Sequence, residues 1–72
     1  MKAYVLIRTW GGKAKDVLES IRGMEEVSEA YGVYGSYDII AKVEGENIAD
    51  LVVDKIRVLD GVIYTNTLII AI

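Results

Sequence analysis

The chain has 72 residues, enough for one small domain and no second one. Hydrophobic residues make up 53% of it, above the usual ~45–50%, which excludes a disordered chain. The net charge of −3 disfavours binding to the phosphates of nucleic acid. Because there is no cysteine or histidine, disulfides, thiolate or imidazole metal sites and histidine-based catalysis are excluded, and we expect neither a metal nor a cofactor.

The first half of the chain predicts a strand, a helix and a second strand. Segment Ala3–Thr9 is short, β-branched and aromatic, and two glycines follow it, as expected for a strand. Apolar residues then recur at helical spacing from Ala14 to Ile21, and Gly23 marks the end of this helix. The second strand is predicted over Val27–Val33.

The second half predicts a hairpin, a helix and a last strand. Tyr34–Tyr37 indicates a turn and Asp38–Val43 a third strand, so the second and third strands are expected to be antiparallel neighbours. Asn47 is predicted to cap a helix whose apolar stripe runs from Ile48 to Leu59. The last and longest strand is expected over Val62–Ala71.

A short internal repeat supports a two-unit fold. Residues 21–27 match residues 56–62 at an offset of 35, and each copy spans a helix end, a turn and the start of an edge strand. Two interleaved right-handed β-α-β units predict the α+β ferredoxin-like βαββαβ sandwich, a four-stranded antiparallel sheet with two helices on one face.

Both faces of the predicted sheet are apolar. In the first strand Tyr4 and Leu6 alternate with aliphatic residues, and in the last strand Val62 is expected on the same side as Tyr64. Two helices cover only one face, and the other would expose a large apolar patch. We therefore predict a homodimer that buries the two helix-free faces together, with interface residues Tyr4, Leu6, Tyr64, Leu68 and Ile70.

Two segments carry the most specific motifs. Residues 27–38 read Val-Ser-Glu-Ala-Tyr-Gly-Val-Tyr-Gly-Ser-Tyr-Asp, and residues 61–67 read Gly-Val-Ile-Tyr-Thr-Asn-Thr. The chain resembles the effector-binding (RAM) domain of the Lrp/AsnC family of transcription regulators, in which a Gly-x-Tyr-Asp hairpin precedes a Thr-x-Thr strand. It departs from that pattern at Tyr34, where the family has threonine or serine, and at Ser36, where aspartate is frequent.

The resemblance implies an amino-acid-binding regulatory and oligomerisation module rather than an enzyme. Domains of this family dimerise through their sheets, and effectors bind where dimers meet, near the hairpin. Because nothing precedes residue 1, we expect one stand-alone domain over residues 1–72 without the family's DNA-binding unit. Such a cytoplasmic domain would bind effector as an oligomer of dimers or co-assemble with full-length regulators, with no direct contact to nucleic acid or membrane.

An amino-acid ligand needs partners for its carboxylate, its ammonium and its side chain. A tight turn at Gly35–Ser36 could present backbone N–H groups to the carboxylate, and Asp38 is the nearest anion for the ammonium. Hairpin aromatic and aliphatic groups could enclose the side chain, and threonines of the last strand could add hydroxyls. The predicted ligand-binding residues are Tyr31, Val33, Tyr34, Gly35, Ser36, Tyr37, Asp38, Thr65 and Thr67.

Structural roles remain open for the same residues. Gly35–Ser36 could be only a turn that Asp38 holds by local hydrogen bonds. Thr65 and Thr67 are good strand formers, and tyrosines are common at subunit interfaces. Trp10 is predicted to be a packing anchor at a strand end, and three glutamates at positions 25, 26 and 29 are expected to form a solvated cluster.

Two other classes of function also fit the fold. One is a small dimeric α+β-barrel enzyme, for which Tyr64, Asn66 or Arg8 would carry catalysis, although no carboxylate pair or nucleophile–base set supports it. The other is a structural oligomerisation module without a ligand. An RNA-recognition module shares the topology, but its aromatic signature is missing and the net charge is of the wrong sign.

Overall fold

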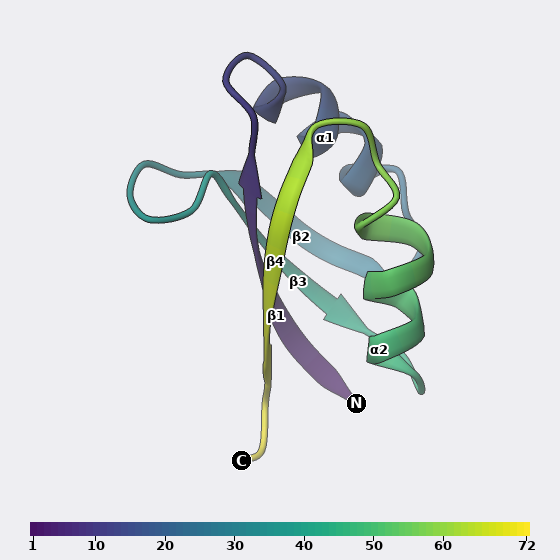
Figure 1. Cartoon of the computed structure of the whole chain (residues 1–72). Helices are drawn as coiled ribbons and strands as arrows, with labels where there is room; N and C mark the ends of the chain where they lie inside the picture. The colour runs from purple at the N-terminus through teal and green to yellow at the C-terminus, as the bar shows by residue number, and fades with distance from the viewer.

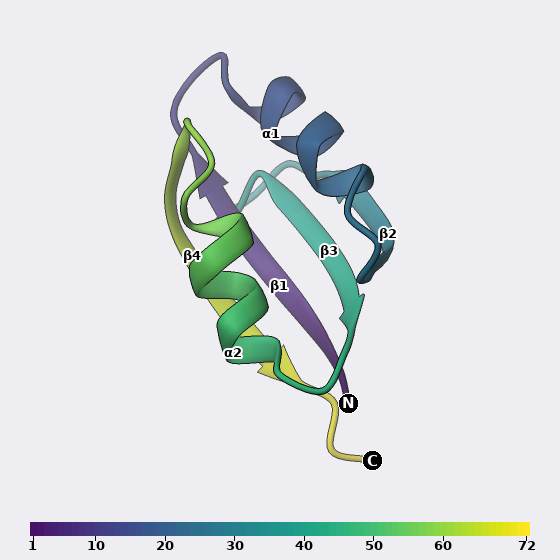
Figure 2. The same cartoon turned by 90° about the vertical axis from the view of Figure 1, so that its right-hand side faces the viewer.

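The sheet has four antiparallel strands in the order β2–β3–β1–β4, as seen in a computed structural model that describes residues 1–72 (Figure 1). Its helices, α1 and the shorter α2 with its continuation η1, lie together on one face (Figure 2). This is the predicted ferredoxin-like βαββαβ sandwich. The elements are β1 (Lys2–Thr9), α1 (Ala14–Arg22), β2 (Val27–Gly32), β3 (Ile39–Glu44), α2 (Ile48–Leu51), η1 (Val52–Ile56) and β4 (Val62–Ile69).

The internal repeat occupies equivalent places in the two units, as predicted. Ile21 and Ile56 are fully buried at the ends of α1 and η1. Val27 and Val62 begin β2 and β4, which form the two edges of the sheet. The predicted antiparallel pairing of β2 with β3 is also confirmed.

The hydrophobic core lies entirely between the sheet and its helices. In β1 the alternation of side chains buries Ala3, Val5 and Ile7 completely, and their partners on β3 are equally buried. Buried side chains of α1, α2 and η1 pack against this layer and complete the core. Its thirteen members are Ala3, Val5, Ile7, Val17, Ile21, Ala30, Ile39, Ala41, Val43, Ile48, Leu51, Val52 and Ile56.

The second helix differs from the single α-helix that the sequence predicts. Asn47 caps it as expected, since its side-chain oxygen accepts a hydrogen bond from the backbone N–H of Asp50 at 3.1 Å. One α-helical turn then widens into a π turn, closed by the N–H of Arg57 donating to the carbonyl of Val52 at 2.8 Å. Apolar spacing could not reveal this change, because Val52 and Ile56 are buried in either kind of turn.

The last strand contradicts one prediction about which side chains share a face. Between Arg8 and Thr9 the register shifts, so that Tyr64 lies opposite Arg8 but Val62 lies opposite Thr9. Val62 therefore turns toward the core, and its expected place beside Tyr64 was wrong. Strict alternation fails at a β-bulge, which inserts an extra residue into one strand. β4 also ends at Ile69 and is no longer than β1.

The indole of Trp10 is not a packing anchor, contrary to the prediction. Its side chain is 63% exposed, and only its backbone is held. The N–H of Trp10 donates to the carbonyl of Gly61 at 2.9 Å, and its carbonyl accepts from the N–H of Lys13 at 3.0 Å. The turn before α1 therefore depends on main-chain bonds and not on the indole of Trp10.

An ion pair joins the turn before β2 to the π turn η1. The Nζ of Lys55 lies 2.6 Å from Oε2 of Glu26, so this glutamate is not part of a freely solvated cluster, contrary to the prediction. The hydrogen bond from the Lys55 ammonium holds the pKa of the Glu26 carboxyl below its usual value. The same bond raises the pKa of Lys55. The pair thus links two segments 29 positions apart.

This ion pair predicts a pH-dependent stability. A carboxyl whose pKa is lowered by folding stabilises the fold above its ordinary pKa of about 4.3, and this stabilisation is lost as pH falls through the lowered value. Glu26→Gln should therefore lower the melting temperature at pH 7, with the difference closing as the pH falls below the ordinary pKa of a glutamate and the carboxyl becomes protonated. Thermal unfolding across this range, with Glu19→Gln as the exposed control, measures the effect. A difference independent of pH would contradict it.

Gly61 is predicted to be irreplaceable by alanine. Its φ of +102° lies in the left-handed region, and an added Cβ would lie 2.7 Å from Cβ of Lys13. Gly61→Ala should destabilise the protein by more than about 1 kcal/mol in denaturant unfolding. Gly45→Ala is the matched control, because no heavy atom lies within 4 Å of its added Cβ, and it should change stability by less than about 0.5 kcal/mol.

Candidate functional site

The connection between β2 and β3 is a loop over residues 33–38, longer than the four-residue turn predicted. It projects beyond the sheet on the side away from the helices (Figure 1). The N–H of Val33 donates to the carbonyl of Asp38 at 2.8 Å and closes the base of the loop. Gly35, at the tip, has a φ of +146°, a conformation that glycine adopts readily. Six of the nine predicted ligand-binding residues lie in this loop.

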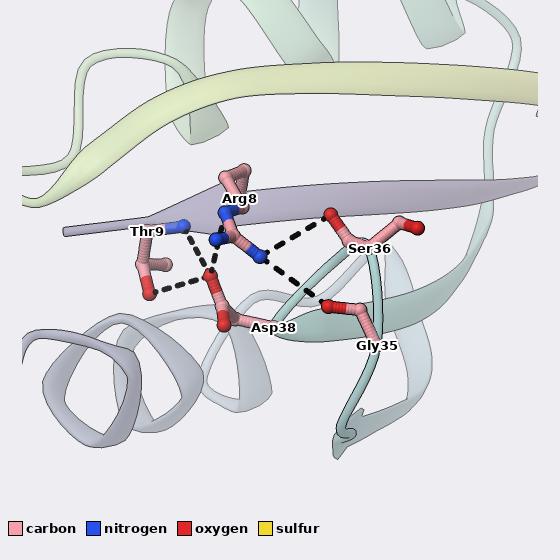
Figure 3. A network of polar contacts seen from close by, with 5 residues as sticks. All are labelled: Arg8, Thr9, Gly35, Ser36 and Asp38. Carbon is pink, nitrogen blue, oxygen red and sulfur yellow. Dashed lines mark hydrogen bonds and ion pairs between the residues drawn. The ribbon is translucent and has the colours of Figure 1, made fainter. Parts of the chain in front are cut away.

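Asp38 ties the loop to the end of β1 (Figure 3). Its backbone N–H donates to the carbonyl of Ile7 at 2.9 Å, which places Asp38 beside Arg8 and Thr9. Its Oδ2 accepts hydrogen bonds from the N–H of Thr9 at 2.8 Å and from Oγ1 of Thr9 at 3.3 Å. The Nε of Arg8 lies 3.8 Å from the same oxygen. The carboxylate is therefore fixed through Oδ2, while Oδ1 makes no hydrogen bond within the chain.

A hollow of about 340 Å³ lies next to Asp38, and Ala14, Gly32, Val33 and Tyr34 complete its lining. Ala14 is the first residue of α1, whose preceding residue makes no side-chain capping bond. The first N–H groups of a helix have no partner within it, and the positive end of the helix dipole favours anions. The hollow thus brings a carboxylate, the first residue of α1 and apolar surface together in one small volume, near the lower end of the ~300–1,000 Å³ typical of ligand sites.

Two predicted ligand residues, Tyr31 and Tyr37, lie instead on the helix-free face. Tyr31 pairs with Ile40 across the β2–β3 ladder. The hydroxyl of Tyr37 accepts a hydrogen bond from Nδ2 of Asn66 at 3.2 Å, and its ring meets that of Tyr64 edge-on, with centroids 6.0 Å apart. Within one protomer these tyrosines belong to the predicted dimer face.

Thr65 and Thr67 form a separate group on the helix side of β4. They pair with Ile7 and Val5 of β1, whose side chains are buried beneath the helices. Oγ1 of Thr65 accepts a hydrogen bond from Nε of Arg57 at 3.1 Å. Both threonines line a groove of about 330 Å³ between β4 and the second helix. Since β1 separates β4 from β3, one protomer does not bring these hydroxyls to the loop.

The residues predicted at the dimer interface do share one face. Tyr4 pairs with Leu68, and Tyr64 lies on the same side opposite Arg8. Leu6 pairs with Ile40 of β3, which extends the apolar surface. In one protomer Leu68 is 51% exposed to solvent, and Ile70 is also exposed. This side of the sheet is called the helix-free face below.

Sequence reasoning missed three residues that shape the site. Arg8 was considered only for the enzyme alternative, and Thr9 and Ala14 were treated as parts of a strand and a helix. A signal for Arg8 was present, because it is the one charged residue in the predicted strand Ala3–Thr9. Its position beside Asp38 depends on the pairing of β1 with β3, which the sequence does not specify residue by residue.

The structure also narrows the classes of protein to which this domain could belong. None of its helices is long and apolar enough to cross a membrane. No three or more carboxylates come together in a way that could hold a metal ion. The sandwich, its apolar helix-free face and the hollow beside a hairpin loop together define a small ferredoxin-like domain with a candidate binding site at one end of its sheet.

Comparison with known proteins identifies the family. The family description "Lrp/AsnC ligand binding domain" matches residues 2–71, and the chain belongs to this family. It is 33% identical over 72 residues to the HTH-type transcriptional regulator FL11 of Pyrococcus abyssi, covering 97% of this chain and 48% of that protein. The chain therefore spans about half the length of the curated relatives it matches.

Two solved structures share both sequence and fold with the chain. FFRP-DM1 is 38% identical with a TM-score of 0.91, and the match covers 97% of each chain. TTHA0845 from Thermus thermophilus is 34% identical with a TM-score of 0.90, covering 97% of this chain and 91% of that one. The relation to Lrp/AsnC regulators that the hairpin and Thr-x-Thr motifs predicted is confirmed.

Proposed function

We propose that this domain binds a free amino acid at the hairpin loop and regulates transcription factors as a homodimer or an oligomer of dimers. The observation that carries the proposal is the hollow beside Asp38, which places an anionic group next to the first residue of α1, a helix without a side-chain cap. Membership of the Lrp/AsnC ligand binding domain family supports it. A transcriptional regulator from Neisseria meningitidis with the same fold, 16% identical, was solved in complex with L-methionine.

Each part of an amino acid has a partner in this proposal. The free Oδ1 of Asp38 accepts from the ammonium, and the first N–H groups of α1 or the N–H groups of Gly35 and Ser36 donate to the carboxylate. Val33 and Tyr34 contact the ligand side chain. The remaining predicted ligand residues, Tyr31, Tyr37, Thr65 and Thr67, would reach the ligand from other subunits.

The same proposal assigns the helix-free face to a second copy of the chain. A single protomer buries only 15 of its 72 residues, and small domains of this size are marginal without further burial. Covering Tyr4, Leu68 and Ile70 with the same surface of a partner would remove these exposed apolar side chains from water. The resulting cytoplasmic oligomer would bind effector by itself or co-assemble with full-length Lrp/AsnC regulators, without gripping nucleic acid directly.

No catalytic role is proposed, because the relatives are transcription regulators. Two of the residues named for the enzyme alternative are occupied in structural bonds: Arg8 with the loop, and Asn66 with Tyr37. The groove beneath the second helix, where a substrate would meet Thr65 and Thr67, contains no carboxylate that could serve as an acid or base.

A thermal-shift screen against the twenty amino acids tests ligand binding. An amino acid at 100 times its dissociation constant should stabilise the protein by about 2.7 kcal/mol. Asp38→Asn keeps an oxygen to accept from Thr9 but removes the charge, so it should weaken binding at least about tenfold, as expected for a charge-assisted bond.

Asp54→Asn serves as the control for this screen, because Asp54 is exposed on η1 and does not line the hollow beside Asp38. Its affinity for the amino acid should equal that of the unchanged protein. The proposal of an amino-acid sensor would be abandoned if no amino acid raised the melting temperature, or if both variants bound as well as the unchanged protein.

Sedimentation tests the predicted dimer. Leu68→Lys places a charge on the helix-free face in both copies, and losing two buried leucines costs about 3 kcal/mol, so the dimer dissociation constant should rise about a hundredfold. Val53→Lys is the matched control, since Val53 is equally 51% exposed but lies on the helix side. Equal assembly of the two variants would show that the helix-free face is not the interface.

A further inference from the structure

We propose that Arg8 is a positioning residue for the loop over residues 33–38, called the ligand loop below, and that subunit pairing through the helix-free face fixes this loop through Arg8. This inference rests on the proposed function, because it concerns how the proposed ligand site is formed. In this arrangement ligand binding and dimer formation depend on each other, because both involve the conformation of the same loop.

Arg8 reaches across the loop from the neighbouring strand β1 (Figure 3). Its Nη1 lies 3.4 Å from the carbonyl oxygens of both Gly35 and Ser36, to which it donates. Its Nε lies 3.8 Å from Oδ2 of Asp38 at the base of the loop. A planar guanidinium presents five N–H donors in a rigid fork, whereas the ammonium of a lysine is a compact point charge with three donors on a flexible stem.

These contacts are the only hydrogen bonds that hold the tip of the loop. No other donor in the chain reaches the carbonyls of Tyr34, Gly35 or Ser36, and their own N–H groups have no acceptor. The side chain of Tyr34 is fully exposed and adds no packing. The conformation of the tip in one protomer therefore depends on Arg8, although its two bonds are long.

The side chain of Arg8 lies on the helix-free face, where the proposed partner binds. It stands opposite Tyr64 in the β1–β4 ladder and is 41% exposed. Tyr37 brings the end of the loop onto the same face, through its ring against Tyr64 and its hydroxyl bonded to Asn66. A second subunit would thus cover the guanidinium and the loop end together.

Exclusion of water strengthens the contacts that hold the loop. Electrostatic interactions grow as the local dielectric constant falls, so the long bonds from Arg8 should tighten once a partner covers them. The loop is then ordered before the ligand arrives, and the entropy cost of binding falls. By linkage, a ligand that requires the ordered loop favours the dimer by the same factor.

Backbone ¹⁵N relaxation of residues 34–37 tests the positioning role without any ligand. Order parameters near ~0.85 denote a rigid backbone and values below ~0.6 a flexible one. Arg8→Gln should lower the values at 34–37 into the flexible range, and Arg8→Lys should give intermediate values. Arg57→Gln is the matched control, because Arg57 also bonds to a neighbouring group, Thr65, but on the other side of the sheet. Unchanged order in Arg8→Gln would overturn the proposal.

A double-mutant cycle tests the coupling to subunit pairing. Leu68→Lys alone, confirmed as a monomer by sedimentation, should loosen residues 34–37, and adding Arg8→Gln should loosen them little further. Additive effects, or a monomer with an ordered loop, would overturn the coupling.

Affinity for the amino acid found in the screen completes the test. It should fall at least tenfold in Arg8→Gln and become independent of dimer formation. If no amino acid binds, the proposed function fails, whereas the relaxation results still decide the role of Arg8.

Discussion

The architecture depends on one geometric constraint: two helices cover only one face of a four-stranded sheet. All thirteen core residues lie between the sheet and these helices, and the other face carries apolar side chains with nothing over them. The chain is too short to add a third layer. A second copy of the same face is the simplest cover, because an isologous contact needs only a surface that complements itself.

Two polar side chains on the helix-free face already have hydrogen-bond partners within the chain. Asn66 already donates to Tyr37, and Arg8 already contacts carbonyls and a carboxylate of the loop. Burying an unpaired polar or charged group is expensive, whereas a paired group loses less when water leaves. The same bonds draw the loop toward the helix-free face, so in the proposed dimer the same side chains would take part in both pairing and the ordering of the loop.

The sequence predicted the parts of the fold that depend on patterns among neighbouring residues. It was less informative about the parts that depend on which residues pair between strands. Local signals predicted the strands, α1, the cap at Asn47 and the hairpin with Asp38. The spacing of apolar residues and the turn-forming residues can both be read from neighbouring positions in the sequence. The bulge in β4 near Val62 and the π turn η1 were missed. A bulge adds one residue to a strand and a π turn adds one residue to a helical turn, and neither changes which residue types are present. The site was predicted only in part for the same reason. Arg8 joins it, and Thr65 lies away from it, through strand order and long-range pairing that become visible only in three dimensions.

The balance of charge at the loop bears on the ligand that the proposed site would prefer. Arg8 and Asp38 together are neutral, and a free amino acid with an uncharged side chain is also neutral as a zwitterion. Binding such a ligand buries no net charge, whereas a ligand with a charged side chain would need a further counter-ion. The hollow supplies none, because its other lining residues are Ala14, Gly32, Val33 and Tyr34. In the proposed site this composition would favour amino acids with uncharged side chains, and the bonds from Asp38 to Thr9 would favour those whose ammonium reaches Oδ1 without moving the loop.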